Sequence, residues 1–388
     1  MKRGPTGHFF PITTLGETCR AFIPAPLPPD PGLLMDEKLQ DLAQRASLAV
    51  GRLDGISMLL PEPQHLLYSY IRKEAVLSSQ IEGTQSSLSD LLLYEAESSP
   101  GVPVDDVREV SNCVAALEHG IQRLREGLPL SLRLIREVHG VLLRDGRGAT
   151  KQPGEFLRSQ NWIGGTRPGN ARHVPPPPDA VIDCMGALEN FLHGQPVAMP
   201  VLIRAALAHV QFETIHPFLD GNGRVGRLLI TLLLHAEGVL SQPLLYLSLY
   251  FKQHRSYYYE LLQSIRTEGD WEEWLTFFLE GVIIVSEQAA STARQLLTLF
   301  HEHQQQVRTL GRLTSSALRV MDHLHRHPVT TPAAVSSATG MSFHTAQRVF
   351  AALQPLGIVT EGTGKKYGRF YTYTRYLDLL NEELPTSA

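Results

Sequence analysis

A chain of 388 residues is long enough for two or three domains. Its hydrophobic content of 43% and charged content of 19% are typical of a globular protein and exclude a disordered one. The formal net charge of -4 argues against a protein that coats nucleic acid along its whole surface. Cys19, Cys113 and Cys184 match neither a disulfide framework nor a zinc-ligand spacing, which favours a reducing compartment. With no apolar run of signal or membrane-spanning length, we expect a cytoplasmic protein without a membrane partner.

The first third of the chain predicts a proline-rich arm followed by helices. Residues 1–34 are rich in proline and predict an extended N-terminal arm. From residue 35 onward apolar residues such as Leu39 and Leu42 recur at helical spacing, so residues 35–120 are predicted to form a helical region. A long helix is predicted over about 64–98 within it. The fold class is therefore mainly α.

The middle of the chain predicts one non-helical insertion between helices. Residues 153–178, which we call the flap, contain short apolar runs flanked by Gly and Asn and predict a β-hairpin. The flap ends in a polyproline segment at 175–178. Helical periodicity returns over about 179–297, with interruptions at 217–223 and 241–244.

A separate C-terminal unit is predicted over residues 312–388. Its pattern predicts three helices over about 314–326, 331–338 and 342–356. A β-prone stretch follows a glycine-containing turn. Three helices and a hairpin at this spacing resemble a winged helix-turn-helix domain.

The most informative stretch covers residues 216–227, with the sequence HPFLDGNGRVGR. A helix is predicted before it, Pro217 cannot continue that helix, and another helix follows. The glycine-rich triplet of this stretch therefore lies where a loop enters a helix N-terminus, whose free N–H groups and positive dipole favour an anion. These three residues are Gly221, Asn222 and Gly223.

Charged side chains surround the predicted anion site. Arg224 and Arg227 are three residues apart, share one side of the first helical turn and add fixed cations. Asp220 supplies a hard oxygen ligand suited to Mg²⁺ that bridges phosphates. His216 can act as a general base for an incoming hydroxyl. The alternative, an ordinary turn with surface arginines, leaves unexplained why the parts of phosphoryl or nucleotidyl transfer occur together.

Residues 216–227 match the signature of the Fic family, HxFx(D/E)GNGRxxR, at every defined position. The resemblance extends over about 35–300 and implies an all-helical Fic catalytic domain over 121–300. It implies a protein adenylyltransferase, which transfers AMP from ATP, with Mg²⁺, to a Ser, Thr or Tyr hydroxyl of a target protein or of itself. Members that transfer plain phosphate carry Lys in place of the second Gly, so Gly223 favours AMP transfer.

The resemblance also assigns roles to individual residues. It implies that His216 deprotonates the hydroxyl, that Asp220 holds Mg²⁺ and that the glycine-rich loop binds the phosphates of ATP. Tyr258 and Tyr259, with Leu262, would border the adenine, although core aromatic residues are the alternative. The chain departs from some relatives at Arg266, where they carry Asn. The flap would dock the target by strand pairing through Asn161, Trp162, Ile163 and Gly164.

A second motif lies far upstream. Ser78, Glu82 and Gly83 match the (S/T)xxxE(G/N) pattern of the inhibitory helix of the same family. The alternative is a solvated glutamate on a helix. The resemblance predicts that Glu82 pairs with Arg227 and occupies the cation meant for the γ-phosphate, so that ATP binds misaligned for attack.

Competing interpretations remain at this stage. His209, Glu213 and His216 share a helix face and could bind a metal, although a third ligand of suitable geometry is not evident. The C-terminal unit could make the protein a DNA-binding regulator with an auxiliary Fic domain, or it could dock another protein. Its candidate contact residues are Ser342, His344, Thr345, Gln347, Arg348, Lys365, Lys366 and Arg369. Homodimerisation and the reverse removal of AMP are left open.

Overall fold

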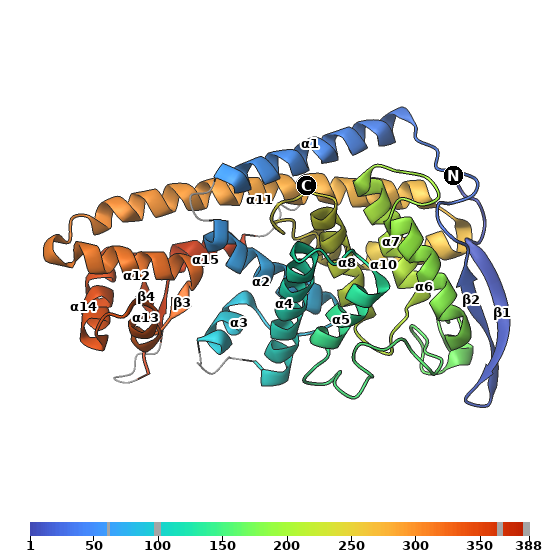
Figure 1. The fold of residues 1–388 in the computed structure, drawn as a ribbon, viewed down its shortest axis with the longest axis horizontal. Coiled ribbons are helices and arrows are strands. Elements are labelled where there is room, and N and C mark those ends of the chain that lie inside the picture. Colours follow the sequence, from blue (N-terminus) through green and yellow to red (C-terminus); the bar gives the residue numbers. More distant parts are fainter. Residues whose placement is uncertain (60–62, 97–101, 363–367, 383–388) are drawn as a thin grey trace.

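Helices make up most of the computed structural model, in agreement with the predicted fold class. The structure describes residues 1–59, 63–96, 102–362 and 368–382. Helices α1 (Glu37–Leu59) and α11 (Trp271–Val307) lie side by side along the long axis of the molecule (Figure 1). At a rise of 1.5 Å per residue α11 is about 55 Å long. The apolar positions that predicted the first helix, including Leu39 and Leu42, are buried.

A β-hairpin replaces most of the predicted N-terminal arm. Strands β1 (Gly7–Thr14) and β2 (Glu17–Pro24) pair antiparallel, with Gly7 opposite Pro24. The prediction of an extended arm over residues 1–34 is wrong here, because most of the prolines lie after residue 23, while aromatic and β-branched residues recur in both strands. Leu15 and Gly16, both at positive φ, form the two-residue turn that such hairpins require.

The predicted helix over 64–98 is two helices, α2 (Pro63–Ile81) and α3 (Leu88–Glu95). The break follows from Gly83, whose φ of 103° lies outside the helical region. Helix α3 then starts with a capping box, in which the Ser87 hydroxyl accepts from the Asp90 N–H and the Asp90 carboxylate accepts from the Ser87 N–H. The predicted end of the single helix lies outside the described residues.

Helices α7 (Val201–Ile215) and α8 (Asn222–Ala236) pack against each other. Thirteen residues from Ile203 to Ile215 are buried in succession in α7, so this helix carries no polar face toward solvent. The loop between the two helices is therefore held within the core. The helices around this pair are α4 (Val104–Arg125), α5 (Leu132–Leu142), α6 (Pro178–Leu192), α9 (Ser248–Gln253) and α10 (Arg255–Glu268), with the short η1 (Pro168–Asn170) inside the flap.

The C-terminal unit has the three predicted helices within a few residues of their expected bounds. It consists of η2 (Gly311–Leu313), α12 (Thr314–Arg326), β3 (Val329–Thr330), α13 (Pro332–Thr339), α14 (Phe343–Leu353), β4 (Thr360–Glu361), β5 (Tyr371–Thr372) and α15 (Thr374–Asn381). Its sheet has the order β3-β5-β4, with antiparallel pairs. Lys365 and Lys366 lie outside the described residues. Across the described ranges, no helix combines the length and apolarity needed to cross a bilayer.

The C-terminal unit packs directly on helix α2, since both α12 and α15 contact it. The Tyr376 hydroxyl donates to the Ser69 hydroxyl at 2.9 Å, and both residues are fully buried. Nearby, the rings of Tyr68 and His327 meet edge to face at 4.7 Å. One helix therefore contacts the C-terminal unit near its start and reaches Glu82 just beyond its end.

We predict that Tyr376→Phe lowers the free energy of unfolding by about 1–3 kcal/mol, because it leaves the buried Ser69 hydroxyl without its donor. Urea unfolding followed by circular dichroism measures this effect. The control is Tyr376→Phe combined with Ser69→Ala, which removes the unsatisfied group and should cost less than the sum of the two single changes. Strict additivity would show that the two hydroxyls do not interact in solution.

Candidate active site

The loop between α7 and α8, residues 216–221, is the motif loop. His216 ends α7 in the left-handed region, with φ of 49° and ψ of 58°, and Gly221 precedes α8 at φ of 76°. The predicted helix end before Pro217 is confirmed, and α8 begins at Asn222, inside the interruption predicted over 217–223. A histidine at positive φ is uncommon and persists only where the surroundings hold it in place.

Two asparagines hold the motif loop. The Asn222 side chain accepts from the Phe218 N–H at 2.9 Å and donates to the Phe218 carbonyl at 2.8 Å. From the flap, Asn161 donates to the same carbonyl at 2.9 Å and to the His216 carbonyl at 3.3 Å. The Phe218 ring is fully buried and stacks on His139 at 3.7 Å. The side chain of Asn161, predicted to belong to the target-docking segment, thus points toward the loop.

The His216 side chain is largely enclosed, with 22% of its surface exposed. Burial, and then the nearby Arg266 guanidinium, lower the pKa of His216 to about 4, although the Glu82 carboxylate opposes them. Its Nδ1 atom is buried and lies 4.0 Å from a Glu213 carboxylate oxygen. The imidazole is therefore neutral near pH 7, the form that can accept a proton.

A cavity of about 380 Å³, the motif pocket, opens beside the loop. It is lined by His216, Asp220, residues 221–224, Glu109 of α4 and Arg147 of the loop that follows α5. The Asp220 side chain is 41% exposed and accepts from the Gly221 N–H at 2.6 Å. The start of α8 presents its first N–H groups to this cavity, as an anion site requires. Nothing in the sequence pattern pointed to Glu109 or Arg147, because they lie on separate elements.

The donor set at the motif pocket fits Mg²⁺ bound together with phosphates. Mg²⁺ is usually held by one or two carboxylates and phosphate oxygens, and Asp220 offers an accessible carboxylate. Among the described residues, no group of three His, Cys, Asp or Glu side chains could hold a metal by itself. His209 is fully buried and hydrogen-bonds the Gly226 carbonyl at 2.9 Å and the Tyr258 hydroxyl at 2.8 Å. It is a satisfied core histidine, which argues against the alternative metal site.

Glu82 pairs with Arg227, as the sequence predicted. Their shortest contact, Nη2 to Oε1, is 2.6 Å. Arg227 is buried and also donates to the Ser78 hydroxyl at 2.8 Å and to the Ser78 carbonyl at 3.0 Å. Burial alone would raise the pKa of Glu82, but the Arg227 guanidinium outweighs it and lowers that pKa. The carboxylate is therefore charged at neutral pH and holds one edge of the guanidinium.

Gly223 contacts Glu82 so closely that a side chain at this position would displace the carboxylate. A Cβ atom on Gly223 would lie 2.3 Å from the Glu82 carboxylate oxygen and 3.2 Å from the Arg227 guanidinium. Gly223, predicted as part of the phosphate-binding loop, therefore also leaves room for the Glu82 carboxylate, which follows the end of α2.

A second cavity, of about 470 Å³, lies on the other side of Glu82, and we call it the tyrosine pocket. Glu82, His216 and Gly223 line both cavities, so the glutamate lies at their junction. Tyr259 is partly exposed there, whereas Tyr258 is 1% exposed and bonded to His209. The remaining lining residues are Trp162, Ile163, Gly164, Arg172, His173, Glu213, Arg227, Tyr258, Tyr259, Leu262 and Arg266.

Arg266 and Glu213 are buried in the wall of the tyrosine pocket. Arg266 donates to the Glu213 carbonyl at 3.1 Å and to the Thr214 hydroxyl at 3.3 Å, and burial lowers its pKa to about 10. Burial raises the pKa of Glu213 to about 7, and one of its carboxylate oxygens has no hydrogen-bond partner among the described residues. From the sequence, Arg266 was noted only as a departure from relatives. Glu213 was considered only as a ligand of the alternative metal site.

The flap hairpin is reduced to a single antiparallel bridge between Ile163 and His173. The His173 carbonyl accepts from the Ile163 N–H at 2.8 Å, and the Ile163 carbonyl accepts from the His173 N–H at 3.1 Å. The predicted hairpin is too long because Gly164 and Gly165 turn the chain at positive φ and η1 then interrupts the return strand. Trp162, Ile163 and Gly164 nevertheless lie beside the tyrosine pocket.

Comparisons with known proteins agree with this geometry. Residues 40–122 match the Fic/DOC family N-terminal model, and residues 129–234 match the Fic/DOC family model. The chain carries a Fic/DOC domain. This second match contains the flap and the motif loop, whereas Tyr258, Tyr259 and the C-terminal unit lie beyond it.

Relatives and solved structures extend the likeness beyond the Fic/DOC domain. The protein adenylyltransferase Fic of Aedes aegypti is 33% identical over 208 residues, 52% of this chain and 38% of that protein. The protein of the same name from Drosophila grimshawi is 32% identical over 203 residues, 52% of this chain and 39% of that protein. The matched region is thus less than half the length of these curated relatives. The fold resembles a Fic family protein from Desulfovibrio desulfuricans, with a TM-score of 0.57 at 20% identity, over 88% of this chain and 97% of that one.

We predict that the His216 imidazole stays neutral to below pH 5, whereas an ordinary histidine titrates near 6.5. Burial and the Arg266 charge both disfavour the protonated ring, so its pKa is shifted down. Side-chain nitrogen chemical shifts measured by NMR across a pH series report this pKa. In Glu82→Gln the opposing negative charge is gone, so the pKa should fall further. A rise in that variant would contradict the assigned electrostatics.

Proposed function

We propose that this chain is a protein adenylyltransferase that transfers AMP from ATP to a hydroxyl side chain of a target protein or of itself. The observation that carries the proposal is the neutral His216 at the junction of two cavities, one at the N-terminus of α8 and the other beside Tyr259. The relatives named protein adenylyltransferase Fic support this activity, although they are longer than the matched region.

In the proposed reaction the phosphates of ATP occupy the motif pocket and the adenosine occupies the tyrosine pocket. The α8 N–H groups and Arg224 bind the phosphates, and Asp220 would hold Mg²⁺, which neutralises their charge. The Nδ1 atom of His216 is buried, so we assign the proton transfer to Nε2. The target hydroxyl loses its proton to His216 and attacks the α-phosphorus, and the bond to the bridging oxygen breaks to release pyrophosphate.

Glu82 restrains this reaction from within the chain. Its carboxylate holds Arg227 at 2.6 Å and stands between the two pockets that a single ATP would have to span. The γ-phosphate is thereby denied its cation, and the α-phosphate is misaligned for attack. Misplacement of reacting atoms by about 1 Å can cost about a hundredfold in rate.

The flap is proposed to dock the target through Trp162, Ile163 and Gly164, which lie beside the tyrosine pocket. Asn161 acts differently, because its side chain donates to two carbonyls of the motif loop. It would fix the flap relative to His216. Docking by strand pairing uses the free backbone edge beside the Ile163–His173 bridge.

The C-terminal unit is proposed to be a winged helix-turn-helix domain. The order α12, β3, α13, α14, β4, β5 and the antiparallel sheet β3-β5-β4 support this assignment. On α14 the exposed residues include His344, Gln347 and Arg348, together with Ser342 at its N-cap. DNA binding through this face, docking of another protein, homodimerisation and removal of AMP all stay predictions.

The experiment that tests the function is incubation with ATP labelled at either the α- or the γ-phosphate. We expect label on protein only from α-labelled ATP, and we expect His216→Ala to lose at least 10²-fold in rate, the usual scale of general base catalysis. The control is His301→Ala, an exposed histidine on α11 far from the pockets. Transfer of γ-label, or a His216→Ala rate above a tenth of the original, would refute the proposal.

We predict that Glu82→Gly raises turnover by roughly ten-fold or more, because it frees Arg227 and joins the two pockets. The gain should appear in kcat rather than in ATP affinity, since alignment in the transition state changes most. Glu82→Gln keeps the bulk without the charge and should give a smaller gain. Adding His216→Ala to Glu82→Gly should abolish transfer. If Glu82→Gly is no more active than the original protein, the inhibitory role is wrong.

We predict that Asp220→Ala lowers transfer strongly at low Mg²⁺ and recovers in part as Mg²⁺ or Mn²⁺ is raised, because a metal ligand is missing while the base is present. Titration of either metal against the initial rate in the Glu82→Gly background measures this recovery. Asp145→Ala, which removes a neighbouring exposed carboxylate, is the matched control. The absence of any metal dependence would make Asp220 a structural residue of the loop.

A further inference from the structure

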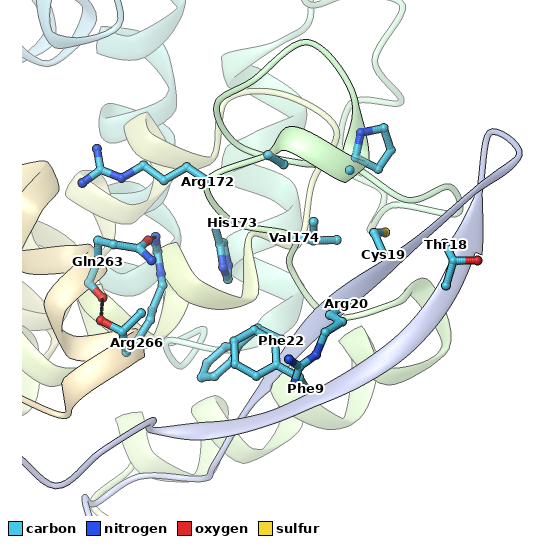
Figure 2. A pocket seen from close by; sticks show the side chains of 14 residues that line it. Phe9, Thr18, Cys19, Arg20, Phe22, Arg172, His173, Val174, Gln263 and Arg266 are labelled. Atoms are coloured by element: carbon cyan, nitrogen blue, oxygen red, sulfur yellow. Dashed lines mark hydrogen bonds between the residues drawn. The ribbon is translucent and has the colours of Figure 1, made fainter.

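A third cavity, of about 340 Å³, lies between the N-terminal hairpin, the flap and α10, and we call it the hairpin pocket. Figure 2 shows Arg20 beside Phe9 and Phe22 on the hairpin side, Arg266 with Gln263 on the helix side, and His173 between them. None of the roles assigned above uses this cavity. Its lining comes from three parts of the chain that are distant in sequence.

Backbone hydrogen bonding and apolar packing hold the hairpin against the flap, so this wall of the pocket is fixed in place. The Phe22 N–H donates to the Val174 carbonyl at 2.8 Å, one residue beyond the flap bridge. The side chains of Cys19, Ala21 and Val174 also form a small buried cluster, and the flap residue Trp162 packs against it. The hairpin therefore continues the flap surface away from His216.

The hairpin pocket carries three guanidinium groups and no carboxylate in its lining. Within the described part of the chain, Arg20, Arg172 and Arg266 have no carboxylate at salt-bridge distance, whereas the neighbouring Arg167 pairs with Glu17 at 2.7 Å. Arg20 lies over the Phe9 ring at 4.5 Å. Arg266 is 7% exposed and bonds only neutral groups. Burial of an unpaired charge is costly, and an anion in the pocket would offset that cost.

We propose that the hairpin pocket binds an acidic side chain, Asp or Glu, of the target polypeptide. This rests on the proposed function, because the occupant is the segment whose hydroxyl reaches His216. The hairpin pocket shares Arg172, His173 and Arg266 with the tyrosine pocket, so it lies next to the site proposed for adenosine and within reach of a strand that follows the flap. Phe9 and Phe22 supply apolar contact for the stem of the acidic side chain.

The polypeptide is favoured over a nucleotide because the pocket continues the flap edge, where backbone pairing is available. The positive charge of the hairpin pocket then favours acidic target segments, because a basic residue would be repelled by its three arginines. Electrostatic complementarity of this kind acts mainly on choice of partner and on the rate of encounter.

The test uses two synthetic peptides that differ only in their flanks, one with Asp and Glu and the other with Asn and Gln around a single Thr and a single Tyr. The 388-residue Glu82→Gly protein is assayed for AMP transfer to each peptide, and kcat and KM are determined separately. We expect about a five-fold lower KM for the acidic peptide, the scale of one or two exposed charge pairs. In Arg20→Gln this preference should fall to about two-fold or less, and in Arg20→Glu it should vanish. Arg45→Gln, an exposed arginine on α1, should keep it.

A second measurement separates this proposal from the proposed function. Fluorescence anisotropy of the labelled peptides with the 388-residue Glu82→Gly, His216→Ala protein reports binding without any transfer of AMP. If no AMP is transferred but the acidic peptide still binds better and loses that advantage in Arg20→Glu, the docking proposal holds and the enzymatic one fails. Equal binding of both peptides, an unchanged preference in Arg20→Glu, or competition by free ATP in place of peptide would overturn the docking proposal.

Discussion

The buried guanidinium of Arg227 is the interaction on which the candidate site depends. It joins α8, which carries the phosphate-binding end of the motif, to α2, through Ser78 and Glu82. A buried cation without such partners would be strongly destabilising, so something must always occupy this position. In the present structure it is the protein's own carboxylate, and in the proposed reactive state it is a phosphate. In the proposed mechanism the restraint and the substrate site thus use the same charge.

The C-terminal unit contacts the helix that leads to the Glu82–Arg227 pair. Helix α2 is continuous from Pro63 to Ile81, with Tyr376 bonded to Ser69 in its first half and Ser78 bonded to Arg227 near its end. The C-terminal unit is thus packed against the same helix that leads to Glu82.

The sequence predicted those parts of the site that are local. The motif loop and the end of the helix before it could be inferred from one contiguous motif. The pairing of Glu82 with Arg227 could be inferred only because two separate motifs resemble the same family. The break at Gly83 and the turn at Leu15–Gly16 were missed, although capping and turn residues marked both. In both places the predicted segment was continued through residues that are typical of a turn or of a new helix start.

The remaining parts could not be predicted from the sequence because they depend on distant contacts. Arg266 and Glu213 acquire their shifted pKa values from burial in the assembled core, which no single segment reveals. Asn161 looked like a docking residue, and only its distance to the Phe218 carbonyl shows that it holds the loop. The hairpin pocket is formed by three separate segments, so composition alone gave no indication of it.

The contact between Gly223 and Glu82 also limits how this protein can evolve. Any residue larger than glycine at position 223 would overlap the carboxylate at 2.3 Å, so the substitution requires Glu82 to move or to be lost. Relatives that transfer plain phosphate resemble this chain but carry lysine there. A side chain at position 223 would therefore displace the Glu82 carboxylate from Arg227. Strong epistasis between two residues 141 positions apart in the chain is the genetic consequence.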